Sequence, residues 1–89
     1  MGHYKKLYKK LKNSPKDVMF DDLEKLMTRA GGFTSITGKG DHYVFSHPEL
    51  ERQISVDCNG KHRPLLPVYV KKSIKAFDEV NPDFLEGDE

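Results

Sequence analysis

The first third of the chain contains two stretches in which apolar residues recur at helical spacing. In the first stretch they fall at i, i+3, i+4 and i+7 with lysines between them, and a proline follows the stretch. In the second stretch, the same spacing follows two aspartates and ends at a pair of glycines. Such stripes are typical of amphipathic helices that bury one face. We therefore predict helices over Tyr4–Leu11 and Phe20–Ala30, with Gly31 and Gly32 giving the second a left-handed end.

The spacing of apolar residues changes after the glycine pair. Residues 33–37, 42–47 and 53–58 alternate between apolar and polar types, which predicts three strands of an antiparallel meander. Two prolines and a glycine make 59–67 a loop, and helical spacing then returns from Val70 to Phe77 and ends before a proline. The predicted fold is α+β, with the order helix, helix, strand, strand, strand, helix and the helices packed on one face of the sheet.

The alternation within the second predicted strand assigns its side chains to faces. The rings of Tyr43 and Phe45 share one face and belong to the core, so the imidazole of His42 lies on the opposite, open face. A compact loop between the second and third strands then sets their register. The pairs predicted across these strands are Phe45 with Ile54, Tyr43 with Val56, and His42 with Asp57.

Length and charge suggest one basic domain followed by an acidic tail. The 89 residues suffice for a single domain, which we place at 1–81, and we expect 82–89 to be an acidic, disordered tail. All 15 Lys and Arg residues precede Asp78, and residues 1–77 contain only 8 acidic residues, so this part carries a net charge of +7. A basic body suits a polyanionic partner such as nucleic acid, although a solvated lysine-rich surface explains the charge almost as well.

The remaining composition argues against several kinds of site. Cys58 is the single cysteine, so an intrachain disulfide is excluded, and with His62 it falls short of the four donors of a closed zinc site. No apolar run has the length of a signal segment or a membrane span. We expect a soluble cytoplasmic protein without metal or cofactor. The lysines of the first helix are assigned to solvent, and His47 to a packed or half-buried position.

Several motifs between Lys10 and Phe77 resemble those of the HicA (YcfA) family of toxins, by pattern rather than by identity. The most informative is a histidine directly after a glycine-rich turn, where the family typically has glycine, serine and histidine. The motifs are "NSPKDVMFDDLEKLM", "AGGF", "GKGDHYVF", "SHP", "ISV" and "YVKKSIKAF".

The resemblance implies a double-stranded-RNA-binding-like (dsRBD-like) fold and a messenger-RNA interferase activity. On this reading His42 is the catalytic residue, mRNA is the substrate, and a HicB-like antitoxin protein is the partner. Histidine suits proton transfer at neutral pH because its ordinary pKa is about 6.5. Asp57, if paired with His42, would orient the imidazole, a role that the family does not require. The predicted contacts to RNA phosphates are Lys39, Lys71, Lys72 and Lys75.

Two positions depart from the family pattern and leave a second function open. Asp41 stands where the family usually has serine, and Asp57-Cys58-Asn59 replaces a frequent proline-x-histidine. The first change adds a negative charge beside a site that should receive phosphate. The alternative is a non-catalytic RNA-binding or protein-interaction module on the same scaffold.

Overall fold

A computed structural model of the chain describes residues 3–38, 40–58 and 63–84. It has the predicted order of elements and an α+β fold. The second predicted helix is present, but its last five residues form a wider π-helical turn, labelled η1. The elements are α1 (His3–Asn13), α2 (Phe20–Lys25), η1 (Leu26–Ala30), β1 (Thr34–Thr37), β2 (His42–Ser46), β3 (Ile54–Asp57) and α3 (Pro67–Val80).

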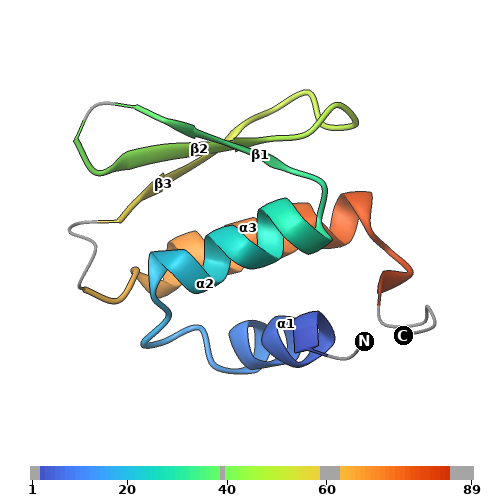
Figure 1. Cartoon of the computed structure of the whole chain (residues 1–89), viewed down its shortest axis with the longest axis horizontal. Helices are drawn as coiled ribbons and strands as arrows, with labels where there is room; N and C mark the ends of the chain where they lie inside the picture. The colour runs from blue at the N-terminus through green and yellow to red at the C-terminus, as the bar shows by residue number, and fades with distance from the viewer. Residues whose placement is uncertain (1–2, 39, 59–62, 85–89) are drawn as a thin grey trace.

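The helices all lie on one side of the sheet, as predicted, but they form two layers. In Figure 1 the sheet lies above α2 and α3, and α1 lies below these two helices. Consistent with this arrangement, α3 contacts β3 and η1 contacts β1, whereas α1 packs against α3 and η1. The inner face of the sheet is therefore covered by α2, η1 and α3, and its outer face is left open.

The sheet is an antiparallel meander in the order β1-β2-β3. Its register is the predicted one between β2 and β3, where Phe45 pairs with Ile54, Tyr43 with Val56, and His42 with Asp57. Exposure alternates along β2, with the rings of Tyr43 and Phe45 buried and His42 exposed. The predicted assignment of faces is therefore confirmed.

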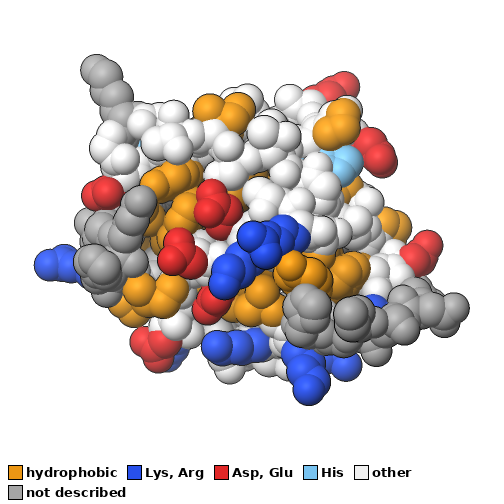
Figure 2. Space-filling model, in the orientation of Figure 1, with side chains coloured by type: hydrophobic (Ala, Val, Ile, Leu, Met, Phe, Trp, Pro, Cys, Tyr) orange, Lys and Arg blue, Asp and Glu red, His pale blue; other side chains and the backbone are white. Residues whose placement is uncertain are grey.

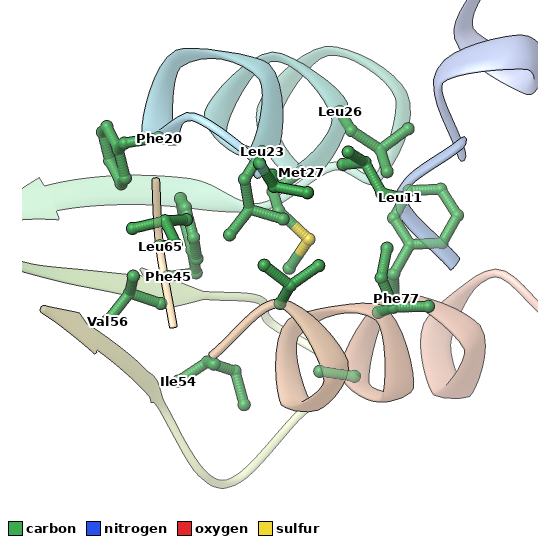
Figure 3. Close-up of a cluster of buried hydrophobic side chains, with 14 of the residues drawn as sticks. Leu11, Phe20, Leu23, Leu26, Met27, Phe45, Ile54, Val56, Leu65 and Phe77 are labelled. Atoms are coloured by element: carbon green, nitrogen blue, oxygen red, sulfur yellow. The ribbon is translucent and has the colours of Figure 1, made fainter. Parts of the chain in front are cut away.

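The core fills the space between the inner face of the sheet and the middle helices. Figure 3 shows Leu23 and Met27 pointing from the α2–η1 segment toward Phe45 of the sheet, with Phe77 of α3 beside them. Phe20 closes one end of this layer, with its ring 4.1 Å from the ring of Tyr43, measured between centroids. Phe45 and Phe77 are both fully buried, so aromatic rings from the sheet and from α3 dominate the packing.

The two glycines of the predicted left-handed stop follow η1. Gly32 has the left-handed conformation, with φ of 78°, but Gly31 has φ of −92° and continues the right-handed turn. The predicted left-handed stop is therefore present, and Gly32 alone provides it. Close packing explains why residue 31 is a glycine. A Cβ atom at this position would lie 2.8 Å from both the Met27 carbonyl oxygen and the Phe77 ring.

Hydrogen bonds account for the wide turn that precedes these glycines. The Thr28 hydroxyl donates to the Glu24 carbonyl oxygen at 2.7 Å, and a side-chain donor at this position competes with the regular helical ladder. The Gly31 N–H then donates to the Leu26 carbonyl at 3.0 Å, which is an i to i+5 bond. Periodicity does not reveal this change, because the apolar residues still face the core.

The C-terminal end of α3 is fixed to the rest of the fold. The Asn81 side-chain amide donates to the carbonyls of Gly31 at 3.1 Å and Phe77 at 3.3 Å. The Phe84 ring packs 4.9 Å from the Phe77 ring and 5.6 Å from the Tyr8 ring. The packed structure therefore continues to Phe84, beyond the predicted boundary at residue 81, and the predicted tail that remains, 85–89, lies outside the described residues.

Gly31→Ala should destabilise the fold. The new methyl group must displace the Phe77 ring or the Met27 carbonyl, and overpacking of this kind typically costs about 1–3 kcal/mol. Urea unfolding should show a lower midpoint for the variant. Gly38→Ala is the control, since a Cβ atom at that position meets its nearest neighbour at 3.4 Å. Equal losses in the two variants would contradict the packing argument.

Ser73→Ala should leave stability unchanged or raise it. Ser73 is fully buried in α3, and its hydroxyl has no hydrogen-bond partner among the described residues. Removing an unsatisfied buried hydroxyl recovers its desolvation cost, and alanine also favours the helix, so a gain of up to about 1 kcal/mol is expected. Thermal and urea unfolding measure the change. A clear loss of stability would mean that the hydroxyl is hydrogen-bonded in solution.

Candidate functional site

His42 is the first residue of β2 and projects from the outer face of the sheet. The turn before it is closed by the Gly38 N–H, which donates to the His42 carbonyl oxygen at 2.7 Å, and Gly40 adopts a left-handed φ of 59° within this turn. The His42 side chain is 66% exposed. The backbone of His42 is hydrogen-bonded to Gly38, and its side chain is open to a large ligand.

Asp57 lies directly across the strands from His42. The two residues are paired in the antiparallel register, and the His42 Nδ1 atom is 3.9 Å from an Asp57 carboxylate oxygen. This distance is longer than a hydrogen bond but short enough for an ion pair when the imidazole is protonated. With side chains 66% and 40% exposed, the pair adds little to stability.

The backbone beside this pair is also tied together. The Cys58 N–H donates to the Asp41 carbonyl oxygen at 2.9 Å, one step past the ladder of β2 and β3. The Asp41 side chain is exposed next to His42. The end of the sheet therefore carries an imidazole with one carboxylate across the strands, Asp57, and an exposed acidic residue, Asp41, next to it in sequence.

The predicted phosphate-binding lysines of α3 do not gather around His42. Lys39 lies outside the described residues. Lys71 and Lys75 line a groove between α1 and α3, and the Lys72 ammonium lies 5.0 Å from the centre of the Tyr69 ring. The buried side chains of α3 are those of Val70, Ser73, Ile74, Ala76 and Phe77, so the lysines are left on the other faces of the helix.

The charges on the face fronted by α2 do not form a basic patch. Figure 2 shows Lys and Arg side chains interspersed with Asp and Glu there, separated by hydrophobic and neutral surface. The net charge of +7 before Asp78 is thus not concentrated on this side. Charge counting along the sequence could not show this distribution.

His47 occupies the half-buried position that was predicted for it. Its ring makes an edge contact with Phe33, with centroids 5.0 Å apart, and its Nδ1 atom accepts a hydrogen bond from the Glu49 N–H at 3.0 Å. The latter bond caps the start of the loop between β2 and β3. His47 is therefore a structural residue at the end of the strand.

A polar cluster between α1 and α3 was not predicted. The Tyr8 hydroxyl donates to the Asp78 carboxylate, and the Lys12 ammonium lies 3.1 Å from the Tyr8 oxygen and 3.4 Å from Asp78. Desolvation, followed by the bond to Asp78, raises the pKa of Tyr8, and the bond to Tyr8 raises the pKa of Lys12. The i, i+4 spacing of Tyr8 and Lys12 was visible in the sequence, but Asp78 is 70 residues away from Tyr8.

Comparisons with known proteins add no relative. No protein-family model, curated protein or solved structure matches the chain. Within the described ranges, no group of three His, Cys, Asp or Glu side chains could hold a metal ion. No helix in those ranges is long and apolar enough to cross a bilayer.

Tyr8→Phe should reduce the loss of stability at alkaline pH. The folded-state pKa values of Tyr8 and Lys12 are raised, so above the ordinary Tyr value of 10.0 the folded chain holds protons that the unfolded chain has released. Stability therefore falls as pH rises through this range. Urea midpoints from about pH 8 to about pH 11 should fall more in the wild type than in the variant.

The same substitution should cost stability at neutral pH, by about 0.5–1.5 kcal/mol for each of the two hydrogen bonds lost, the one donated to Asp78 and the one accepted from Lys12. Tyr69→Phe is a suitable control, because it removes a tyrosine hydroxyl of α3 outside the Tyr8, Lys12 and Asp78 cluster. Parallel alkaline curves for wild type and Tyr8→Phe would contradict the assignment.

Proposed function

We propose that the chain is a small endoribonuclease of the HicA toxin type, with His42 as the general acid–base residue. The observation that carries the proposal is the position of His42, exposed at the head of β2 with the Asp57 carboxylate 3.9 Å away. An exposed imidazole with a carboxylate neighbour is a common arrangement for proton transfer. The resemblance of "GKGDHYVF" to the family's turn and histidine supports the same residue.

The proposed reaction is attack of a ribose 2′-hydroxyl on the adjacent phosphate. The bond from the 2′-oxygen to phosphorus forms as the bond to the 5′-oxygen of the next nucleotide breaks, which leaves a cyclic phosphate and a 5′-hydroxyl. His42 takes the 2′-hydroxyl proton, and the leaving oxygen gains a proton from the imidazolium or from water. Such proton transfer is worth about 10²- to 10⁴-fold in rate and requires no metal ion.

Residues near His42 in sequence or across the strands take the remaining roles. Asp57 orients the imidazole. Lys39, three positions before His42 in the turn, is assigned to the phosphate at the cleaved bond. Lys71, Lys72 and Lys75 belong to α3, which packs beneath the sheet, so they are not assigned to that phosphate.

The outer face of the sheet also suits a protein partner. Ile36 is 47% exposed and is paired with the half-buried Val44, so an apolar strip crosses β1 and β2. His42 lies on the same face, two positions before Val44. A HicB-like antitoxin that covers this strip would also cover His42, and both proteins would then act in the cytoplasm, where mRNA is translated.

The second candidate is a non-catalytic RNA-binding or protein-interaction module. Two observations favour it: the exposed Asp41 carboxylate beside His42, and the separation of the α3 lysines from the outer face of the sheet. Both weaken the attraction of phosphate to His42. A module would bind without cutting, and this difference is measurable.

His42→Ala should abolish RNA cleavage. The purified wild type is expected to cut a single-stranded RNA in the presence of a chelator, and the variant should be slower by at least about 10²-fold because general acid–base catalysis is lost. Labelled RNA resolved on a denaturing gel gives the rates. Asp57→Asn should produce a smaller loss.

Ser55→Ala is the matched control, since Ser55 is exposed on the outer face of the same sheet. It should keep full activity, and circular dichroism should show all the variants folded. Cleavage at the same rate by wild type and His42→Ala would reject the catalytic assignment. Salt-sensitive RNA binding without any cleavage would instead establish the module.

A further inference from the structure

A groove between α1 and α3 is separate from the His42 site. Its volume is about 240 Å³. This is smaller than the roughly 300–1,000 Å³ typical of small-molecule and cofactor sites, and it is close to what one or two apolar side chains of a docked segment would fill. The lining residues are Leu11 and Lys12 of α1 and Lys71, Ile74, Lys75 and Asp78 of α3.

The groove has an apolar floor and a basic rim. Leu11 and Ile74 are almost completely buried and form the floor. Asp78 is bound by the Tyr8 hydroxyl and the Lys12 ammonium, so its charge is already compensated. Lys71 and Lys75 are in none of the salt bridges of the described residues, although Lys75 interacts at longer range with the Glu79 carboxylate, and the two ammonium groups make the rim basic.

An apolar residue extends the groove along α3. Val68 precedes Lys71 by three positions and Lys75 by seven, which places the three side chains on one stripe of the helix. Val68 is 60% exposed, among the most exposed large apolar side chains of the described chain. The stripe and the groove together present an exposed valine, two lysines and a hollow the size of a side chain. This surface is complementary to a peptide in which apolar and acidic residues alternate from turn to turn.

We propose that this groove binds an acidic amphipathic segment of a partner protein. The partner's apolar side chain enters the hollow over Leu11 and Ile74, and its carboxylates meet Lys71 and Lys75. The basic rim favours acidic side chains on the partner, and the apolar floor favours a peptide over RNA. An RNA strand would use the lysines but needs aromatic surfaces for its bases, and the groove lining has none.

The proposal does not rest on the nuclease assignment. The groove lies between α1 and α3, the two elements that Figure 1 places beneath the open sheet, whereas His42 projects from the opposite, outer face. A partner held in the groove therefore leaves His42 uncovered. Failure of the cleavage experiment would not affect binding at the groove, and failure of binding would not affect cleavage.

The test uses the full chain and a short synthetic helical peptide with leucine on one face and glutamate on the other. The methyl signal of Ile74 reports binding by NMR, and Ile36 on the outer sheet face is the internal reference. The peptide should shift the Ile74 signal in a salt-sensitive manner. Lys71→Glu combined with Lys75→Glu should weaken binding by at least about tenfold, since two attractive pairs become repulsive.

Lys10→Glu combined with Lys25→Glu is the matched control, because it changes the net charge equally at exposed lysines that do not line the groove. This control should bind the peptide within about twofold of the wild type. A second peptide with glutamine in place of glutamate should not bind. Equal weakening by both lysine pairs would overturn the proposal, since it would show attraction to net charge alone.

Three further outcomes would also overturn it. An RNA oligonucleotide that shifts Ile74 where the acidic peptide does not would make the groove an RNA site. Peptide binding that appears only in the full chain carrying Glu86→Gln and Asp88→Asn would make the occupant the chain's own acidic segment. Self-association that is lost in Lys71→Glu with Lys75→Glu, without peptide binding, would make the occupant a second copy.

Discussion

The pleat of β2 is the constraint on which the rest of the molecule depends. Tyr43 and Phe45 are buried against Phe20 and the middle helices, and neighbouring residues in a strand must point to opposite faces. His42 is exposed on the outer face for this reason and not because of any local preference of histidine. A shift of β2 by one residue would bury the imidazole and expose the rings, so the same packing that stabilises the core also presents the candidate site.

The packing of α3 determines where its lysines lie. Its buried face must supply apolar side chains to the sheet and to α1, which leaves its lysines on the remaining surface. The chain thus has two separate candidate surfaces, an imidazole–carboxylate pair on the open sheet and a basic groove between helices. A surface lysine shares a site with His42 only if its own element reaches that face, and α3 does not.

Much of the fold was predictable because it follows from local periodicity. The order of elements, the two faces of β2 and the pairing of His42 with Asp57 depend on alternation and on one compact loop, and all of them are present. The groove and the cluster of Tyr8, Lys12 and Asp78 were not predicted, because they depend on how α1 docks on α3. The tight position of Gly31 likewise depends on Phe77, 46 positions further along the chain.

The π-helical turn at Leu26–Ala30 has a consequence for comparing this chain with others. A turn closed by an i to i+5 bond holds one residue more than an ordinary helical turn over the same rise. A homologous protein with a regular helix here would therefore need one residue fewer between Lys25 and Phe33. Only then would the side chains of its first strand point to the same faces of the sheet as they do here. Alignments that forbid a gap inside the helix would misplace every strand residue that follows, His42 included.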